Sequence, residues 1–187
     1  MTMQVVQRFT VTDFKAFKNQ PENEDRLFEL VDGEIIEVSP RLRHGRAAST
    51  IHGQIFRYLL QNPIGEVMFE VEHQLPDDPD NARLPDVSYI SNERLTLINP
   101  DEPIPFMPDL AVEVKSPGNT LLDLRAKIAF YLANGTRLGL IMNPANRMIE
   151  LYPKDEDVQM LMESDTLDLS SVLPDLKITL ADLFRGA

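Results

Sequence analysis

The stretch that decides the fold is residues 108–117, which read Pro-Asp-Leu-Ala-Val-Glu-Val-Lys-Ser-Pro. Its apolar run, residues 110–114, lies between prolines and is typical of a short buried strand that a proline then ends. Side chains alternate between the two faces of a strand, so Glu113 and Lys115 are expected on one face, opposite the larger apolar residues. Burying a charge is costly unless the charge is paired or binds a metal. Glu113 and Lys115 are therefore the first candidates for function.

Helices and strands are predicted on both sides of this stretch, from hydrophobic periodicity, capping residues and turn residues. Helices are expected over 10–18, 43–60, 120–134 and, as a short closing turn, 180–184. Strands are expected over 27–31, 34–38, 66–75, 84–91, 110–114, 137–143 and 148–152. This order, without internal repeats, predicts a mixed α/β fold: a mixed sheet flanked by helices, with strand 110–114 central and followed by a crossover helix.

A β-hairpin over residues 27–38 is the clearest local prediction. Asp32-Gly33 is favoured chemistry for a two-residue type I′ turn, and the register that follows places Glu29 opposite Ile36. Glu29 then lies among aliphatic side chains, and an acid that breaks such a pattern is a candidate for function. Glu37 breaks the pattern on the other face in the same way, so the pattern alone does not choose between the two acids.

The composition is that of an ordinary globular protein, with 43% hydrophobic and 26% charged residues among 187. The chain has no cysteine, which excludes disulfides, thiolate nucleophiles and cysteine-based zinc sites. No apolar run approaches the ~18 residues that a membrane span requires, and residues 1–10 have no apolar signal core. We expect one domain over residues 1–187, in the cytoplasm and without a membrane partner.

The net charge of −12 argues against a simple basic sheath around nucleic acid. Charge is nevertheless uneven, because residues 41–61 hold four arginines and no acid. On the expected helix, Arg43, Arg46 and Arg57 fall opposite the apolar stripe. This face is either the solvated back of the helix or a surface that contacts the phosphate backbone of a nucleic acid.

Asp86, at the start of the strand before 110–114, supplies a second carboxylate. Two carboxylates on neighbouring strands can hold Mg²⁺ or Mn²⁺, which prefer oxygen ligands. A metal held by Asp86 and Glu113 would polarise a phosphoryl oxygen and help ionise an attacking water, and Lys115 could stabilise the developing charge. These residues are the minimum set that metal-dependent phosphodiester hydrolysis requires. The alternative interpretation of the same residues is an ion pair at a strand edge and an aspartate in a turn.

Lys127 also has two interpretations. It follows Asp123 by four residues, which is the spacing of a surface ion pair on a helix. Alternatively, its side chain reaches the site of Asp86 and Glu113 from this helix. The three histidines have no metal-site spacing, so packing or surface positions are expected for His44, His52 and His73. Serine-hydrolase and nucleotide-binding glycine motifs are absent from the sequence.

Four motifs together resemble one protein family. They are Phe-Glu-Leu-Val-Asp-Gly-Glu-Ile at 28–35, Pro-Asp-Val at 85–87, Val-Glu-Val-Lys-Ser-Pro at 112–117 and Asp-Leu-Arg-Ala-Lys-x-x-x-Tyr at 123–131. Their order closely resembles the Uma-two family, an endonuclease branch of the PD-(D/E)xK, restriction-endonuclease-like superfamily, over about residues 9–184. The resemblance implies a restriction-endonuclease-like core with an N-terminal β-hairpin extension.

The resemblance also implies a catalytic set of Asp86, Glu113 and Lys115, and it favours Glu29 over Glu37 as the acid of the hairpin. Many relatives carry another residue at the position of Lys115 and keep a lysine where Lys127 stands. This chain has both lysines, so both remain candidates.

The leading hypothesis is therefore a Mg²⁺-dependent (or Mn²⁺-dependent) DNA endonuclease that acts as a homodimer. Asp86, Glu113 and the carbonyl of Val114 would bind the metal, and Glu29 would be an outer ligand or a base. Either Lys115 or Lys127 would position water and stabilise charge, and the arginine face would hold DNA.

The alternative, motivated by the net charge of −12, is a catalytically silent nuclease-like domain that binds nucleic acid or a protein partner. A third possibility is a purely structural protein.

Overall fold

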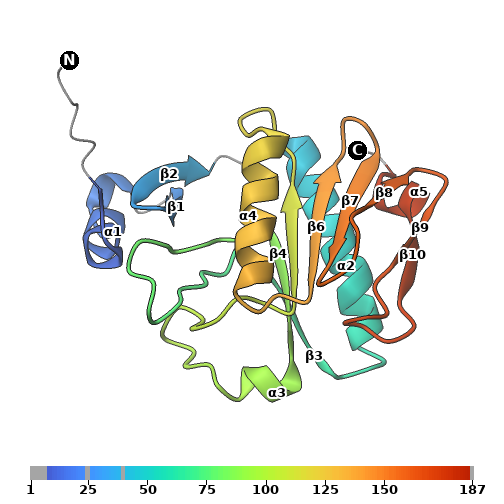
Figure 1. Ribbon diagram of the computed structural model, residues 1–187, viewed down its shortest axis with the longest axis horizontal. Helices are drawn as coiled ribbons and strands as arrows, with labels where there is room; N and C mark the ends of the chain where they lie inside the picture. The colour runs from blue at the N-terminus through green and yellow to red at the C-terminus, as the bar shows by residue number, and fades with distance from the viewer. Residues whose placement is uncertain (1–7, 24–25, 39–40, 186–187) are drawn as a thin grey trace.

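The computed structural model describes residues 8–23, 26–38 and 41–185. Its centre is a six-stranded mixed sheet with helices on both faces (Figure 1), which confirms the predicted mixed α/β class. Neighbouring strands pair antiparallel except β5 and β6, which are parallel. The strands in spatial order are β3 (Gly65–Phe69), β4 (Val87–Ser91), β5 (Leu110–Val114), β6 (Leu138–Asn143), β7 (Met148–Pro153) and β8 (Gln159–Met162).

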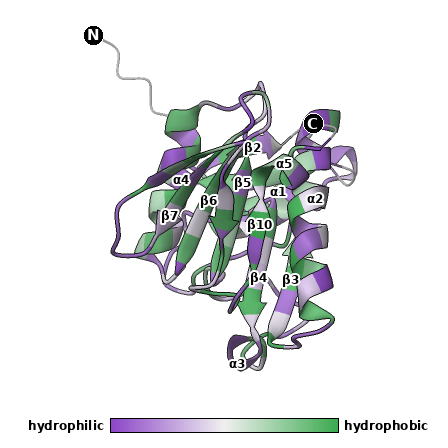
Figure 2. Cartoon of the chain, turned by 90° about the vertical axis from the view of Figure 1, so that its right-hand side faces the viewer, coloured by the Kyte–Doolittle hydropathy of each residue, from purple (hydrophilic) through white to green (hydrophobic). Residues whose placement is uncertain are grey.

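Two helices cover the sheet. Helix α2 (Leu42–Leu59) packs on one face, in a core cluster that includes Val112 and Val114 of β5. Helix α4 (Leu121–Ala133) packs on the other face, in a cluster that includes Ala111. Because strand side chains alternate, Glu113 lies on the face opposite Val112 and Val114, as predicted, and this is the face that α4 covers. Figure 2 shows hydrophobic residues along the central strands and hydrophilic ones on the outer side of α2.

Helix α4 is the crossover that two parallel neighbouring strands require. It begins with the predicted capping box: Thr120 accepts a hydrogen bond from the N–H of Asp123, and the Asp123 carboxylate accepts one from the N–H of Thr120. The helix lies very close to β6, because a Cβ atom built on Gly139 would lie 2.6 Å from a methyl carbon of Ile128. The inner face of α4 therefore packs tightly against the sheet at this point.

The N-terminal part consists of α1 (Val11–Lys18), a 3₁₀ turn (Pro21–Asn23) and the hairpin β1 (Leu27–Val31) and β2 (Glu34–Val38). The predicted register is confirmed, and Asp32 and Gly33 have φ values of 49° and 80°, as a type I′ turn requires. Leu30 exchanges two backbone hydrogen bonds with Ala82, which lies shortly before β4. This bridge holds the hairpin beside the central sheet.

Some elements differ from the prediction. The strand expected over 66–75 ends at Phe69, because Glu70 has a φ of 46° and a left-handed residue does not continue a strand. The C-terminal part adds β8 and the pair β9 (Thr166–Asp168) and β10 (Lys177–Thr179), and a short helix α3 (Asn92–Leu95) follows β4; none of these was predicted. The closing helix α5 (Leu180–Leu183) was predicted. Within the described ranges, no helix is both long and apolar enough to cross a membrane.

Candidate active site

A cavity of about 240 Å³ lies between the hairpin, the start of β4, the end of β5 and α4. We call it the carboxylate cavity. Its lining includes Glu29, Asp86, Glu113 and Lys127, which are far apart in the sequence. All three of these acids are buried. The structure thus brings together four of the five predicted catalytic residues.

Asp86 immediately precedes β4 and is held by two donors. Its Oδ2 atom accepts a hydrogen bond of 2.6 Å from the N–H of Val114 and lies 3.1 Å from Nε2 of His44. The first bond locks Asp86 onto the end of β5, next to Glu113. The carboxylate is therefore fixed by the backbone of the strand that carries the second acid.

Glu113 is only 2% exposed. Its carboxylate accepts a hydrogen bond of 2.6 Å from the hydroxyl of Tyr131 and lies 3.4 Å from Nζ of Lys127. Burial raises the pKa of Glu113 to about 8; the charge of Lys127 opposes this shift, and the carboxylates of Asp86 and Glu29 add to it. The repulsion between these crowded carboxylates is thus part of what raises the pKa of Glu113.

Lys127 reaches this cavity from the inner side of α4. Its ammonium lies 2.5 Å from Glu29, whose other oxygen accepts a hydrogen bond of 3.0 Å from the N–H of Leu84. Burial alone would lower the pKa of Lys127, but the charges of Glu113 and Glu29 outweigh burial and raise it. The surface pair with Asp123 is not formed, because Asp123 caps the helix through Thr120; that interpretation was wrong.

Lys115 lies elsewhere. Strand β5 ends at Val114, so strand alternation no longer dictates the direction of the next side chain, and the ammonium of Lys115 donates to the carbonyls of Ser116 and Asn119. Lys115 lines a different cavity, of about 700 Å³. The expectation that Glu113 and Lys115 share one site on one face is therefore wrong in this structure.

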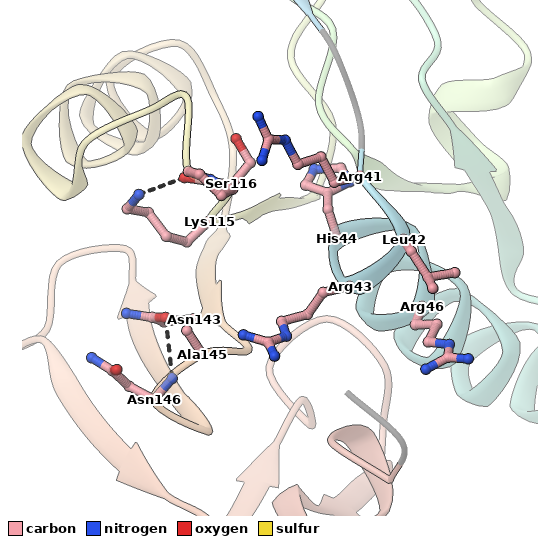
Figure 3. A pocket seen from close by; sticks show the side chains of 11 residues that line it. Arg41, Leu42, Arg43, His44, Arg46, Lys115, Ser116, Asn143, Ala145 and Asn146 are labelled. Atoms are coloured by element: carbon pink, nitrogen blue, oxygen red, sulfur yellow. Dashed lines mark hydrogen bonds between the residues drawn. The ribbon is translucent and has the colours of Figure 1, made fainter.

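This larger cavity, which we call the arginine cavity, is lined by Arg41, Arg43 and Arg46 from the start of α2 (Figure 3). Arg57 lies about four turns further along the helix, is exposed and donates to Gln54. Of the three predicted DNA-binding arginines, the structure places two beside the site and one away from it.

Sequence reasoning missed His44, for which packing or a surface position was expected. His44 is buried beside Asp86; burial tends to lower its pKa, but the hydrogen bond and charge of Asp86, with smaller effects of Glu113 and Glu70, raise it overall. A signal existed, because His44 lies one helical turn before Ala48 on the apolar stripe of α2. Tyr131, which ends the motif at 123–131, was given no role in the site, yet its hydroxyl donates a hydrogen bond to Glu113.

The donors in the carboxylate cavity suit a hard divalent cation. The N–H of Lys115 donates to Met142 on β6, so the Val114 carbonyl of the same peptide group is directed away from β6, to the side of β5 on which β4 lies. Within the described ranges, no three histidine or acidic side chains are grouped as a metal site. Two carboxylates and a carbonyl nevertheless fit Mg²⁺, which keeps several of its waters.

Asp86 and Glu113 lie side by side at neighbouring strands of a mixed sheet, the arrangement that the resemblance to restriction-endonuclease-like domains implies. The family model Uma2, described as "Putative restriction endonuclease", matches residues 12–181, and the chain belongs to this family. A crystal structure of a "putative nuclease belonging to DUF820" from Anabaena variabilis is similar, with a TM-score of 0.80 and 21% identity over 95% of this chain and 98% of that one. At that identity the likeness shows the fold. No curated protein matches the sequence.

Proposed function

We propose that this protein is a nuclease that hydrolyses phosphodiester bonds of DNA at the carboxylate cavity, with Mg²⁺ or Mn²⁺ as its cofactor. The observation that carries the proposal is the convergence of three buried carboxylates, Glu29, Asp86 and Glu113, on one lysine. Membership of the Uma2 family supports the nuclease class. The crowding of carboxyl groups around one lysine supports the cation, because a divalent ion would relieve the repulsion between their ionised forms.

Asp86, Glu113 and the Val114 carbonyl would hold the ion. When bound, the ion would polarise the phosphoryl group and lower the pKa of an attacking water. The protein's part is to fix the two carboxylates before substrate arrives: the Val114 N–H orients Asp86, and the Tyr131 hydroxyl orients Glu113.

Lys127 is our choice for the catalytic lysine, because its ammonium lies in the carboxylate cavity and that of Lys115 does not. A raised pKa keeps Lys127 protonated, so it can stabilise negative charge that develops on the phosphate. The ammonium of Lys127 lies 2.5 Å from Glu29 and 3.4 Å from Glu113. Because Glu29 is the closer partner, we assign to it the role of holding Lys127 in place rather than that of removing a proton from water.

The DNA backbone would follow the start of α2, with Arg43 and Arg46 near the site and Arg57 at the far end of the contact. Arginine suits this role, because its guanidinium offers several donors to phosphate oxygens. The homodimer and the cytoplasmic location stay predictions; size-exclusion chromatography with light scattering tests the first.

A plasmid-nicking assay with Mg²⁺ or Mn²⁺ tests the proposal. We expect wild-type protein to nick, EDTA to stop the reaction, and Asp86→Asn and Glu113→Gln to be inactive. Glu156→Gln, an exposed acid after β7, is the matched control and should stay active. Equal cleavage by all variants would show that the activity does not come from this cavity.

The net charge of −12 favours a second candidate, a domain that binds nucleic acid or a protein without cutting. It would be supported if DNA and RNA were bound but never cleaved with either metal.

A further inference from the structure

The arginine cavity is enclosed by the start of α2, the loop after β5 and the turn between β6 and β7. Of the residues that the structure describes, eleven line it, and they include three arginines and Lys115 but no aspartate or glutamate. The whole chain has 30 acids and 18 lysines and arginines, so this local excess of positive charge runs against the overall composition. A cavity of this charge favours an anionic ligand.

Two of the cations are available for a ligand. The guanidinium groups of Arg41 and Arg43 form no ion pair with any residue that the structure describes. Figure 3 shows both extending from the start of α2 toward the opposite wall, which Ser116 and Asn143 help to form. The ammonium of Lys115 is bound to the carbonyls of Ser116 and Asn119, so it adds charge to the cavity and fixes its wall.

The start of α2 adds to this field. Arg41 is the N-cap residue of this 18-residue helix and makes no side-chain capping bond, so the first N–H groups of the helix lack that partner. His44 lines the cavity, and its Nδ1 atom is buried with no hydrogen-bond partner among the described residues. Uncapped N–H groups beside arginines are a favourable place for phosphate.

The arginine cavity adjoins the carboxylate cavity. Both are lined by His44 and Ser116, so an anion in one lies next to the acids of the other. We propose that the arginine cavity binds the backbone phosphate that neighbours the cleaved phosphodiester on the same strand, through Arg41 and Arg43. This inference rests on the proposed function for its substrate, and it assigns Lys115 to the wall of this phosphate site.

Nucleic-acid binding in EDTA tests the phosphate site apart from cleavage. We would measure the anisotropy of a fluorescent single-stranded oligonucleotide at several salt concentrations, with wild type, Arg41→Ala, Arg43→Ala and the double variant. Each single change should weaken binding about tenfold, as for a lost charge-assisted hydrogen bond. Each should also reduce the slope of log K against log salt by about 0.7. Inorganic phosphate should compete with the oligonucleotide for wild type.

The matched control is Lys154→Ala. Lys154 is exposed, and its N–H binds the carbonyl of Arg137 just before β6, at the end of the strand away from the cavity. The oligonucleotide affinity of Lys154→Ala and the salt dependence of that affinity should match those of wild type. Arg41 and Arg43 are exposed side chains, so thermal unfolding should show that their variants fold.

The outcomes separate the two proposals. If the arginine variants lose affinity but wild type cleaves nothing with Mg²⁺ or Mn²⁺, the phosphate site stands and the nuclease proposal fails. If wild type cleaves and Glu113→Gln does not, yet the arginine variants bind like wild type, the phosphate site is overturned. Absence of oligonucleotide binding by wild type also overturns it.

Discussion

The two neighbouring cavities have opposite chemistry. The carboxylate cavity holds three buried acids around Lys127, whereas the described residues that line the arginine cavity are cationic or neutral. Each contains one of the two lysines that the sequence left as equal candidates. The difference shows that a lysine's place in a motif does not determine which charges the fold arranges around it.

Removal of a carboxylate should give the largest effect. Asp86→Asn or Glu113→Gln should lower the rate of nicking by about 10³-fold, because the ion's stabilisation of transition-state charge is worth several kcal/mol. Single-turnover cleavage with saturating enzyme measures this rate, and calorimetric titration should show that the variants bind Mn²⁺ more weakly than wild type. Unchanged Mn²⁺ affinity in both variants would show that Asp86 and Glu113 do not bind the metal.

The same substitution at the two lysines compares the cavities directly. Lys127→Met should lower kcat by about 10²-fold, the usual cost of losing one group that stabilises developing charge. Lys115→Met should cost about tenfold at most in kcat/KM, through a loosened wall of the arginine cavity. A larger kcat loss in Lys115→Met than in Lys127→Met would reverse our assignment. Thermal unfolding of both variants is needed as a control, because Lys127→Met leaves Glu29 and Glu113 unpaired.

The pair of Arg125 on α4 and Glu150 on β7 helps hold the helix that carries Lys127. Arg125 donates two hydrogen bonds, of 2.9 and 2.7 Å, to Glu150, and these bonds lower the pKa of Glu150. Because the pKa of Glu150 is lower in the folded protein than in the unfolded chain, the ion pair stabilises the fold fully above about pH 4.5, the pKa of the unfolded chain. This stabilisation is lost as the pH falls through the pKa of Glu150 in the folded protein. Glu150→Gln should cost about 2 kcal/mol at pH 7.

Chemical unfolding at pH 7 and at lower pH measures this effect. The difference in stability between wild type and Glu150→Gln should shrink on acidification. A constant difference would mean that the ion pair with Arg125 does not set the pH dependence. Reduced cleavage by Glu150→Gln at pH 7 would show that the position of Lys127 depends on this pair.

Arg57 should give the smallest effect. Arg57→Ala is expected to weaken DNA binding about twofold, as for an exposed charge at the edge of a contact, whereas Arg43→Ala should weaken it about tenfold. Fluorescence anisotropy in EDTA at one salt concentration compares the DNA affinities of the two variants. Equal losses would mean that DNA follows the whole outer face of α2 and that the arginine cavity has no special role.

Local features followed directly from the sequence. The register of the hairpin came from Asp32-Gly33, the start of α4 from its capping box, and the bounds of β5 from an apolar run before a proline. Each depends on residues close together in the chain, whose spacing is set by the geometry of one turn, helix or strand. The short strands β8, β9 and β10 lacked such a signal, because their side chains are largely exposed or their runs very short.

The sequence by itself therefore predicted the mixed α/β fold and singled out as candidates Asp86, Glu113 and, through the family resemblance, Glu29. Only the tertiary structure separated Lys127 from Lys115, placed His44 beside Asp86 and gathered Arg41 with Arg43 into a cavity. The physical reason is that periodicity predicts which face of an element a residue occupies. It does not predict which distant element packs on that face, nor where a side chain turns once its strand has ended.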